Sequence, residues 1–202
     1  KQIIAITGVR RSGKSTIMLQ FIKQLIEKGI KPRNILYVNF EDLRFEEFTL
    51  ESLNKIYEVY LEYLNPDSEQ YIFLDEIHKI DNWERFARTM HELKKVQVFV
   101  SGSNAKLLSG KISSVLTGRH LDLKVFPLSF KEFLDFRGIK IENNLEIISQ
   151  RYRIKSLLKE YLDYGGFPLV SLQEQKKEIL ETYFEDIINR DVVENYRIEN
   201  VS

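Results

Sequence analysis

The chain has 202 residues, of which 43% are hydrophobic and 30% charged, a composition typical of a globular protein. It contains no cysteine, which excludes a disulfide framework, a thiolate metal site and a cysteine nucleophile and fits a cytoplasmic protein. Its 30 basic residues balance its 30 acidic residues, so no overall charge would attract nucleic acid to the chain.

Membrane-spanning and signal segments are not expected in this chain. The sequence has no run of 18 apolar residues, so we expect no transmembrane helix. The first residues, KQIIAITG, lack a long apolar stretch and a small-residue cleavage site, so we expect no signal peptide. The chain starts without Met inside an expected strand and ends on ENVS without an obvious stop. We therefore expect it to be a piece of a longer protein.

Strands and helices are predicted to alternate up to residue 127. Short apolar runs predict five strands, and helical spacing of apolar residues predicts three helices between them. The predicted strands are 2–7, 34–40, 70–75, 96–101 and 121–126, and the helical positions run over 18–25, 50–64 and 83–93. This alternation is typical of an α/β fold in which helices cover both faces of a parallel sheet.

The pattern changes after Pro127, where only helices are predicted. They cover 129–137, about 145–164 and about 173–196. The change places the expected domain boundary near residue 127, between a core of residues 1–127 and a helical region of residues 128–202. Because no Gly/Ser-rich or Pro-rich linker marks the boundary, we expect the helical region to pack on the sheet.

The strongest motif is GVRRSGKS, which matches G-x-x-x-x-G-K-S/T in full and lies between a predicted strand and a predicted helix. Its glycines let backbone N–H groups surround phosphate oxygens at a helix N-terminus. Lys14 would add charge for the β- and γ-phosphates, and the Ser15 hydroxyl can ligate Mg²⁺. For Arg10 and Arg11, a solvated position is an equally good interpretation. The expected nucleotide-binding residues are Gly8, Val9, Arg10, Arg11, Ser12, Gly13, Lys14, Ser15 and Thr16.

A second motif is the acidic pair Asp75 and Glu76 at the end of an apolar strand. Ligands of parallel sheets bind beyond the carboxyl ends of the strands, where the phosphate loop also lies. We expect Asp75 to hold Mg²⁺ through a water. Glu76 is expected to orient and activate the water that attacks the γ-phosphate. The alternative is a solvated strand end, where acidic residues are common.

Three further polar positions are candidates. Ser103 or Asn104 would contact the γ-phosphate or the attacking water if the fourth strand lies between the first and third, and the alternative is an ordinary turn. Arg119 would stabilise transition-state charge in cis or from a neighbouring subunit, and the alternative is a surface arginine. The histidines do not share metal-ligand spacing and are predicted to be structural or solvated: His78, His91 and His120.

Six segments in chain order carry a family resemblance: GVRRSGKST, YVNFED, FLDEIHKIDNWE, SGSNAKLLS, LTGRHLDLKVFPLSFKEFL and YLDYGGFP. Together they resemble prokaryotic AAA-type ATPases related to the archaeal ATPase and STAND group, which usually carry a C-terminal DUF4143 domain. The resemblance covers nearly the whole chain. It implies a P-loop NTPase fold with strand order 5-1-4-3-2, a helical lid, and hydrolysis of ATP rather than GTP.

The resemblance also implies roles for individual residues. Lys14 and Ser15 correspond to the Walker A pair, and Asp75 and Glu76 to the Walker B pair. Asn104, with Ser103, falls at the sensor-1 position. Arg119 falls where such proteins keep an arginine finger.

The segment 165–168, GGFP, resembles a lid motif that closes over adenine. Its glycines would allow a tight helix exit and a close backbone approach, and the Pro168 ring could pack on a base. We therefore expect Gly166 and Pro168 to contact nucleotide, with a plain C-cap turn as the alternative. Residues 189–191, NRD, look like the family's RD stretch, for which no role is assigned.

The leading interpretation is a Mg²⁺-dependent ATPase that acts as a switch or motor. A slow-cycling nucleotide-binding regulatory module and a P-loop phosphotransferase are the alternatives. Glu76 favours hydrolysis, because a pure binder needs no catalytic base. A nucleic-acid-acting ATPase fits the fold, but the zero net charge does not support it. The expected partners are ATP or ADP, further copies of the chain, and a protein partner or C-terminal domain of unknown identity, with no membrane.

Overall fold

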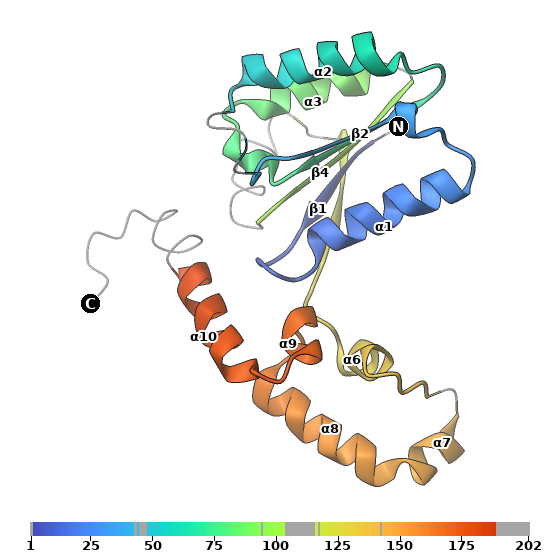
Figure 1. The fold of residues 1–202 in the computed structure, drawn as a ribbon, viewed down its shortest axis with the longest axis vertical. Coiled ribbons are helices and arrows are strands. Elements are labelled where there is room, and N and C mark those ends of the chain that lie inside the picture. The colour runs from blue at the N-terminus through green and yellow to red at the C-terminus, as the bar shows by residue number, and fades with distance from the viewer. Residues whose placement is uncertain are drawn as a thin grey trace. The chain divides into compact units, whose positions relative to one another are not determined.

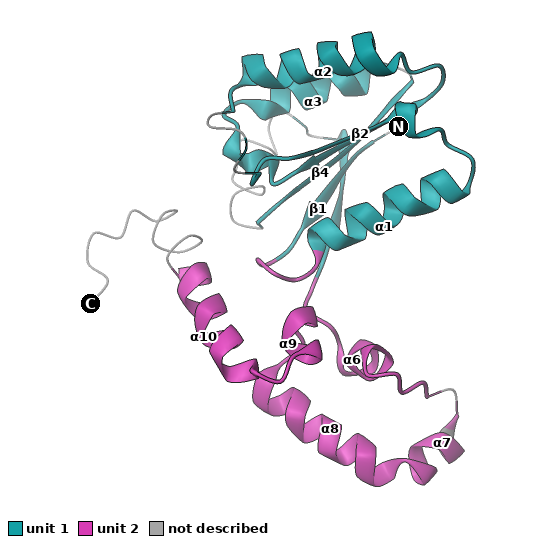
Figure 2. Cartoon of the chain, in the orientation of Figure 1, with its two compact units in different colours: residues 1–8, 14–125 teal, residues 9–13, 126–202 magenta. Residues whose placement is uncertain are grey.

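The computed structural model describes residues 2–42, 44, 48–93, 95–103, 116, 118–141 and 143–188 (Figure 1). It divides into two compact units (Figure 2). Unit 1 comprises Lys1–Gly8 and Lys14–Val125, and unit 2 comprises Val9–Gly13 and Phe126–Ser202. Within the described ranges, no helix combines the length and the apolar character needed to cross a membrane.

Unit 1 is built on a five-stranded parallel sheet with the order β2-β3-β4-β1-β5. This order confirms the one that the family resemblance implies. The strands are β1 (Ile3–Thr7), β2 (Ile35–Asn39), β3 (Gln70–Asp75), β4 (Val96–Gly102) and β5 (His120–Lys124). They are joined by the helices α1 (Lys14–Glu27), α2 (Leu50–Leu64) and α3 (Trp83–Glu92) and the short segments η1 (Pro32–Asn34) and η2 (Ile77–Lys79).

Helices cover both faces of the sheet: α1 packs on one face, and α2 and α3 pack on the other (Figure 1). Successive strand residues point to opposite faces, so each central strand contributes to two cores. On β3, Phe73 faces α1 and stacks on Phe99 of β4 with 4.5 Å between ring centroids. Its neighbours Ile72 and Leu74 face α2 and α3 instead. These strands therefore need apolar residues at nearly every position, which is how they were recognisable in the sequence.

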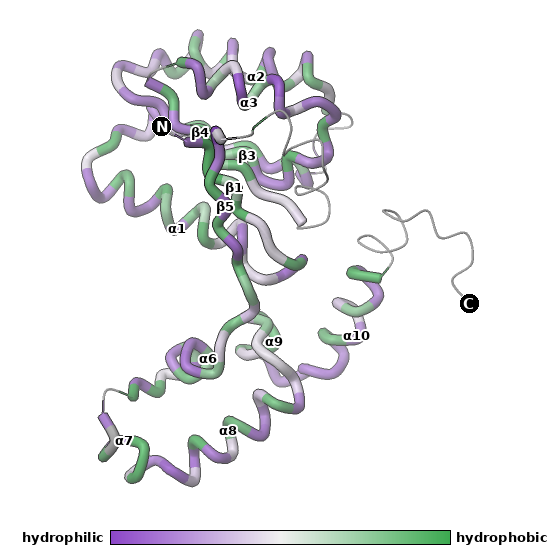
Figure 3. Tube along the Cα trace, turned by 180° about the vertical axis from the view of Figure 1, so that it is seen from behind, coloured by the Kyte–Doolittle hydropathy of each residue, from purple (hydrophilic) through white to green (hydrophobic). Residues whose placement is uncertain are grey.

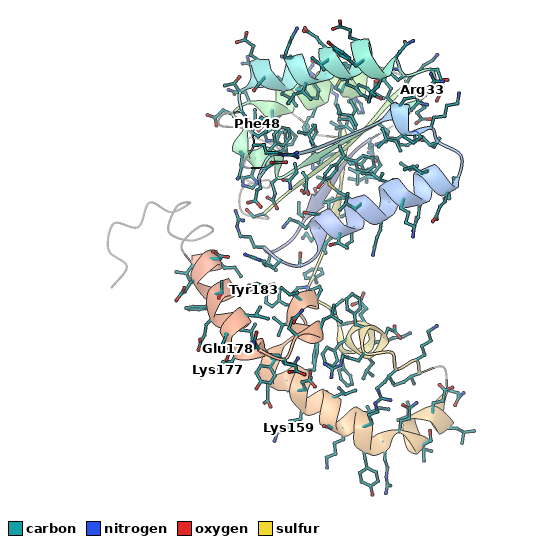
Figure 4. The ribbon with its side chains drawn as sticks, viewed as in Figure 1. Arg33, Phe48, Lys159, Lys177, Glu178 and Tyr183 are labelled. Carbon is teal, nitrogen blue, oxygen red and sulfur yellow. The ribbon has the colours of Figure 1, made fainter. Side chains whose placement is uncertain are left out.

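Local signals fix where α2 begins and ends. Thr49 and Ser52 form a capping box at its N-terminus, with the Ser52 N–H donating to Thr49 Oγ1 at 3.1 Å. Phe48, labelled in Figure 4, precedes the cap and packs edge-on against Phe40 at 4.7 Å between ring centroids. At the other end Asn65 adopts a left-handed conformation that closes the helix. Along α1 and α2, hydrophobic and hydrophilic residues alternate with the turns of the helix (Figure 3).

Apart from the loop Val9–Gly13, the described part of unit 2 is mainly helical. Its helices are α6 (Phe130–Phe136), α7 (Asn144–Ser149), α8 (Arg151–Tyr164), α9 (Pro168–Leu172) and α10 (Lys176–Ile187). A small core forms between α6 and α8 from Phe133, Leu134, Ile139 and Leu157. The predicted helix over about 173–196 corresponds to α10, and the positions from 189 onward lie outside the described residues.

The prediction of one helix over about 145–164 is wrong. The chain breaks at Gln150, with φ −105° and ψ 13°, into α7 and α8. Leu145 and Ile148 are 77% and 64% exposed, so the apolar positions of α7 do not extend the buried stripe of α8. The short helix α9 was not predicted, although Pro168 at its first position is a known start signal.

Two adjacent glycines end α8, and each has a different physical reason. Gly165 adopts φ +74°, and its N–H closes the helix on Tyr161 O at 2.8 Å. Gly166 lies against the backbone of Leu128: its carbonyl accepts the Leu128 N–H at 2.7 Å, and a β-carbon placed on it would lie 2.1 Å from Leu128 O. Tyr161 OH donates to the same Leu128 oxygen at 2.9 Å. The predicted tight helix exit is present, and the close approach that the structure shows at Gly166 is to the backbone of Leu128.

This contact predicts that Gly166→Ala destabilises the nucleotide-free protein. The new β-carbon cannot fit without moving the backbone of Leu128, so we expect the free energy of unfolding to fall by about 1–3 kcal/mol. Gly138→Ala is the matched control, since nothing lies within 4 Å of its added carbon and only its positive φ of +73° is penalised, by about 1 kcal/mol. Urea unfolding without nucleotide measures both. A Gly166→Ala protein as stable as the parent would mean that this contact does not hold the turn.

Candidate functional site

The phosphate-loop motif has the predicted structural context. β1 ends at Thr7 and α1 begins at Lys14, so residues 8–13 connect a buried strand to the N-terminus of a helix. Lys14 is only 4% exposed. Its Nζ lies 3.3 Å from Gly8 O and 3.5 Å from Glu76 Oε1. Ser15 is partly buried and Thr16 is exposed on the first turn of the helix. The motif therefore places a buried ammonium group at the carboxyl edge of the sheet.

The middle of the loop, Val9–Gly13, belongs to unit 2 and contacts other parts of that unit. Gly13 has φ +103°, a conformation that favours glycine. A β-carbon placed on Gly13 would meet Pro168 Cγ at 4.0 Å, which is ordinary contact. Arg11 donates from Nη2 to Asp186 Oδ2 at 2.8 Å, and its guanidinium lies 4.8 Å from the ring centroid of Tyr183, labelled in Figure 4. The loop thus contacts α10 through Arg11, and Gly13 lies near Pro168 of α9.

Asp75, the last residue of β3, is fully buried and held from both sides in the sheet. On one side lies β4, where the pairing of Leu74 with Val100 brings Ser101 next to it. Ser101 Oγ donates to Asp75 Oδ1. On the other side lies β2, from which Tyr37 OH donates to Asp75 Oδ2 at 2.8 Å. Each carboxylate oxygen therefore receives one hydroxyl hydrogen.

The Tyr37 phenol is the donor in this pair. Burial first, and then the nearby carboxylate of Asp75, raise the pKa of Tyr37 far above its usual value. A phenol whose pKa is raised stays protonated across the physiological range. Tyr37 OH therefore remains the donor in its hydrogen bond to Asp75 Oδ2.

Glu76 is buried next to Lys14, with an unusual backbone conformation. Its φ of +54° is left-handed, which is uncommon for a residue other than glycine and is often found at functional sites. Its N–H donates to Ser101 Oγ at 3.0 Å. Its Oε1 lies 3.5 Å from Lys14 Nζ, and its Oε2 lies 3.2 Å from His78 Nδ1. The structure therefore brings together the two motifs that the sequence marked as catalytic.

Two hydroxyl groups at the neighbouring strand tips are buried without a hydrogen-bond partner among the described residues. They belong to Thr7, at the end of β1, and Ser103, directly after β4. Buried polar groups are normally satisfied, so an orphaned hydroxyl beside a motif indicates a site for a polar ligand. The predicted sensor-1 residue Asn104 follows Ser103 and lies outside the described residues.

The structure does not bring Arg119 to Lys14 and Glu76. β5 runs parallel to β1 with His120 beside Ile3, so Arg119 directly precedes the paired region. The Ile3 N–H donates to Arg119 O at 2.8 Å. Lys14 and Glu76 lie beyond the carboxyl ends of the strands, whereas Arg119 lies at the amino-terminal edge. This placement excludes a role for Arg119 at the phosphate loop of its own chain in this structure.

Sequence reasoning missed three residues of this site: Tyr37, Ser101 and His78. Tyr37 reads as a core residue of an apolar strand, and only its pairing with β3 reveals the contact with Asp75. Ser101 belongs to the same strand tip, where the sequence pattern favours Ser103 and Asn104 instead. His78 was predicted to be structural or solvated, and its position two residues after Glu76 was the available signal.

The side chains at this edge of the sheet are suited to bind a nucleoside triphosphate together with Mg²⁺. Lys14 supplies a buried positive charge, and Ser15 and Asp75 supply the oxygen ligands that hard cations prefer. The hydroxyls of Thr7 and Ser103, which have no hydrogen-bond partner among the described residues, would be available to donate to phosphate oxygens. The anion and the cation would each find complementary groups at one edge of the sheet.

Comparisons with sequence relatives point to one family. A family model described as an AAA domain matches residues 1–134. An uncharacterized protein of Methanocaldococcus jannaschii is 37% identical over 203 residues, which cover 99% of this chain and 44% of that protein. An uncharacterized protein of Haemophilus influenzae is 34% identical over 193 residues, which cover 94% of this chain and 46% of that protein. The chain therefore spans less than half the length of these curated relatives.

Solved structures share the fold at low sequence identity. A DNA polymerase III gamma-subunit-related protein of Thermotoga maritima has a TM-score of 0.50 and 14% identity, covering 93% of this chain and 73% of that one. Hsp104 of S. cerevisiae, in a casein complex, has a TM-score of 0.53 and 14% identity, covering 95% and 35%. PCH-2 of C. elegans has a TM-score of 0.51 and 13% identity, covering 93% and 60%.

Proposed function

The chain belongs to the AAA domain family, and on that premise we propose that it binds ATP with Mg²⁺ and hydrolyses it as a switch or motor module. One observation carries the proposal: the Lys14 ammonium and the Glu76 carboxylate lie 3.5 Å apart, both buried, at the carboxyl edge of the sheet. A phosphate-binding cation and a base in contact suit hydrolysis better than binding alone.

The phosphate loop is proposed to bind the triphosphate. The N–H groups at the start of α1 point out of the helix N-terminus, where anions are favoured. Lys14 would exchange its contact with Glu76 for the β- and γ-phosphates. Ser15 and Asp75 would hold Mg²⁺, with Asp75 acting through a water. The metal ion would neutralise charge that develops on the phosphate oxygens.

Glu76 is proposed to take the proton from the attacking water. Once Lys14 turns to the phosphates, the Glu76 carboxylate is released to accept that proton, with His78 still 3.2 Å from its other oxygen. Ser103, with Asn104 after it, is proposed to contact the γ-phosphate or this water. The backbone N–H of Glu76 donates to Ser101 Oγ, and this hydrogen bond fixes the backbone position from which the Glu76 side chain extends.

The segment 165–168 is proposed to form a lid over the base of the nucleotide. The support is the ordinary contact between Pro168 and the position of a β-carbon on Gly13, within unit 2. Gly166 would act by holding the turn against Leu128 rather than by touching nucleotide itself. A nucleotide-bound structure tests this proposal, because adenine beyond van der Waals distance of residues 165–168 would contradict it.

A slow-cycling nucleotide-controlled module is the second candidate. The observation that favours it is that both oxygens of Glu76 lie close to cationic or titratable side chains, Lys14 and His78. The base must be released before it can act, which would slow turnover. Steady-state ATP hydrolysis separates this candidate from a fast motor, and adding DNA, RNA or candidate proteins shows whether a partner accelerates it.

Substitution of Lys14 tests nucleotide binding directly. We expect Lys14→Ala to weaken Mg²⁺–ATP binding about 10- to 150-fold, because charge-assisted hydrogen bonds contribute about 1.5–3 kcal/mol. Lys23→Ala is the matched control, since Lys23 is exposed on the same helix and pairs only at the surface with Glu27. Titration calorimetry measures both affinities, and thermal unfolding confirms that both variants fold. Equal ATP affinity of Lys14→Ala and the parent would rule out the binding assignment.

A further inference from the structure

The carboxylate of Asp75 has a partner on each neighbouring strand, and the partner on β2 is not the residue expected from strand pairing. The register of β2 with β3 places Asn39 directly beside Asp75 and Tyr37 beside Phe73. The Asn39 side-chain oxygen instead accepts the Glu41 N–H at 2.8 Å, in its own loop. Tyr37 reaches diagonally across two residues to Asp75 Oδ2 at 2.8 Å. The contact is therefore specific to a long side chain that ends in a hydroxyl.

Tyr37 lies on the sheet face that α1 covers, in the same core cluster as Phe73 and Phe99. Its ring is packed among apolar side chains, so its hydroxyl has little freedom to move. Asp75 is fully buried at the end of the same face. With Ser101 donating to the other oxygen, rotation of the Asp75 carboxylate about its last torsion would break two hydrogen bonds. The orientation of the carboxylate is thus fixed before any ligand arrives.

We propose that Tyr37 is a positioning residue that holds the Asp75 carboxylate in the orientation needed for Mg²⁺ at the nucleotide site. This inference rests on the proposed function, in which Asp75 holds the metal ion through a water. Each carboxylate oxygen has two lone pairs, so one remains on each oxygen after the hydroxyls of Tyr37 and Ser101 are satisfied. A preset carboxylate avoids the loss of rotational freedom on metal binding, which is the general benefit of preorganisation.

The test is Tyr37→Phe, which removes the hydroxyl and keeps the ring in the core. ATP affinity is measured by calorimetry over a series of Mg²⁺ concentrations and again in EDTA. We expect the Mg²⁺ concentration for half-maximal ATP binding to rise about five- to tenfold, because outer-shell partners of metal ligands typically contribute 10- to 100-fold and this contact acts through a water. ATP affinity in EDTA should stay at the parental value.

Tyr57→Phe is the matched control. Tyr57 OH donates to Gln70 Oε1 at 2.9 Å, at the opposite end of the same strand β3. The substitution removes a partly buried tyrosine hydroxyl, comparable to that of Tyr37 but far from Asp75, and we expect parental values in both titrations. If Tyr37→Phe behaves like Tyr57→Phe while the parent needs Mg²⁺, the positioning role is wrong. A parallel loss of affinity in Mg²⁺ and in EDTA would also overturn it, since that indicates a general structural defect. A parent whose ATP binding ignores Mg²⁺ would instead count against the proposed function.

Discussion

Glu76→Gln is expected to keep ATP binding and to lower the rate of hydrolysis about 10²- to 10⁴-fold, the contribution typical of a positioned general base. Glutamine has the shape of glutamate, but its amide cannot accept a proton from water at neutral pH. The backbone at this position is already held by the Ser101 hydroxyl at 3.0 Å, so the side chain should start from the same place. The variant therefore separates binding from chemistry.

The geometry of the site also predicts the direction of any change in ATP affinity. In the parent, the buried Glu76 carboxylate lies 3.5 Å from Lys14 Nζ and competes with phosphate for that ammonium group. The neutral amide competes less, so Glu76→Gln should bind ATP at least as tightly as the parent. Asp75→Asn should behave differently, because it changes the group proposed to hold Mg²⁺ and should weaken Mg²⁺-dependent binding.

The control for this experiment is Glu92→Gln, at the end of α3. Glu92 is exposed and pairs with Arg88 at 3.3 Å, a surface contact that contributes little. It should leave hydrolysis and binding unchanged. Multiple-turnover phosphate release measures the rates, and calorimetry measures the affinities. If Glu76→Gln hydrolyses ATP at the parental rate, Glu76 is not the general base, despite its contacts with Lys14 and His78.

The residues of the site that sequence could predict are those in contiguous motifs. The spacing of residues 8–15 predicts phosphate binding, and the pair Asp75–Glu76 at a strand end predicts metal binding and general-base catalysis. Both segments lie at the carboxyl ends of parallel strands, so the sheet brings them together. The Lys14–Glu76 contact is the result. Tyr37 is different, because its contact depends on which strand lies beside β3 and in which register. That information resides in the packing of the whole sheet and in no local pattern.

In the helical unit, the errors have the same physical origin. Leu145 and Ile148 continue an apolar helical spacing into α8, and no glycine or proline marks a stop at Gln150. The prediction assumed that apolar residues at helical spacing are buried together, yet both side chains are more than half exposed. The role of Gly166 was likewise only partly predictable from the sequence. Sequence indicated a close approach, but the approached group, Leu128 O, is 38 residues earlier in the chain and is identified only by the fold.

Arg119→Ala is expected to lower hydrolysis by about 10³-fold or more, if Arg119 serves as the arginine finger of a neighbouring copy. The structure restricts how it can act. Arg119 precedes β5 at the amino-terminal edge of the sheet, while Lys14 and Glu76 lie beyond the opposite edge. Five strand residues at about 3.3 Å each place about 16 Å of sheet between them, more than an arginine side chain spans. Any contact of Arg119 with a γ-phosphate must therefore be made in another chain.

An interaction in trans requires a head-to-tail assembly, in which the edge with Arg119 faces the nucleotide edge of the next copy. Hydrolysis per subunit by the parent should then rise with protein concentration. Arg119→Ala should abolish that rise without weakening ATP binding, because binding uses groups of the other edge. Arg88→Ala, which removes an exposed arginine of α3, is the matched control and should retain both properties.

Mixing two inactive variants gives the sharpest result. The Lys14→Ala chain lacks a phosphate-binding ammonium but still offers Arg119, and the Arg119→Ala chain has the reverse defect. With random mixing in equal amounts, about one quarter of head-to-tail interfaces join an intact phosphate loop to an intact arginine, so about a quarter of parental turnover should return. The control is a mixture of Lys14→Ala with Arg88→Ala chains. This mixture should keep about half of parental turnover, because every Arg88→Ala chain has an intact phosphate loop and every neighbour offers Arg119.

Absence of recovery in the Lys14→Ala and Arg119→Ala mixture, together with full activity of a monomer at high dilution, would show that Arg119 is only a surface charge. Recovery in the mixture would instead make the nucleotide site a property of two chains, with the base and the metal ligand supplied by one and the arginine by the other.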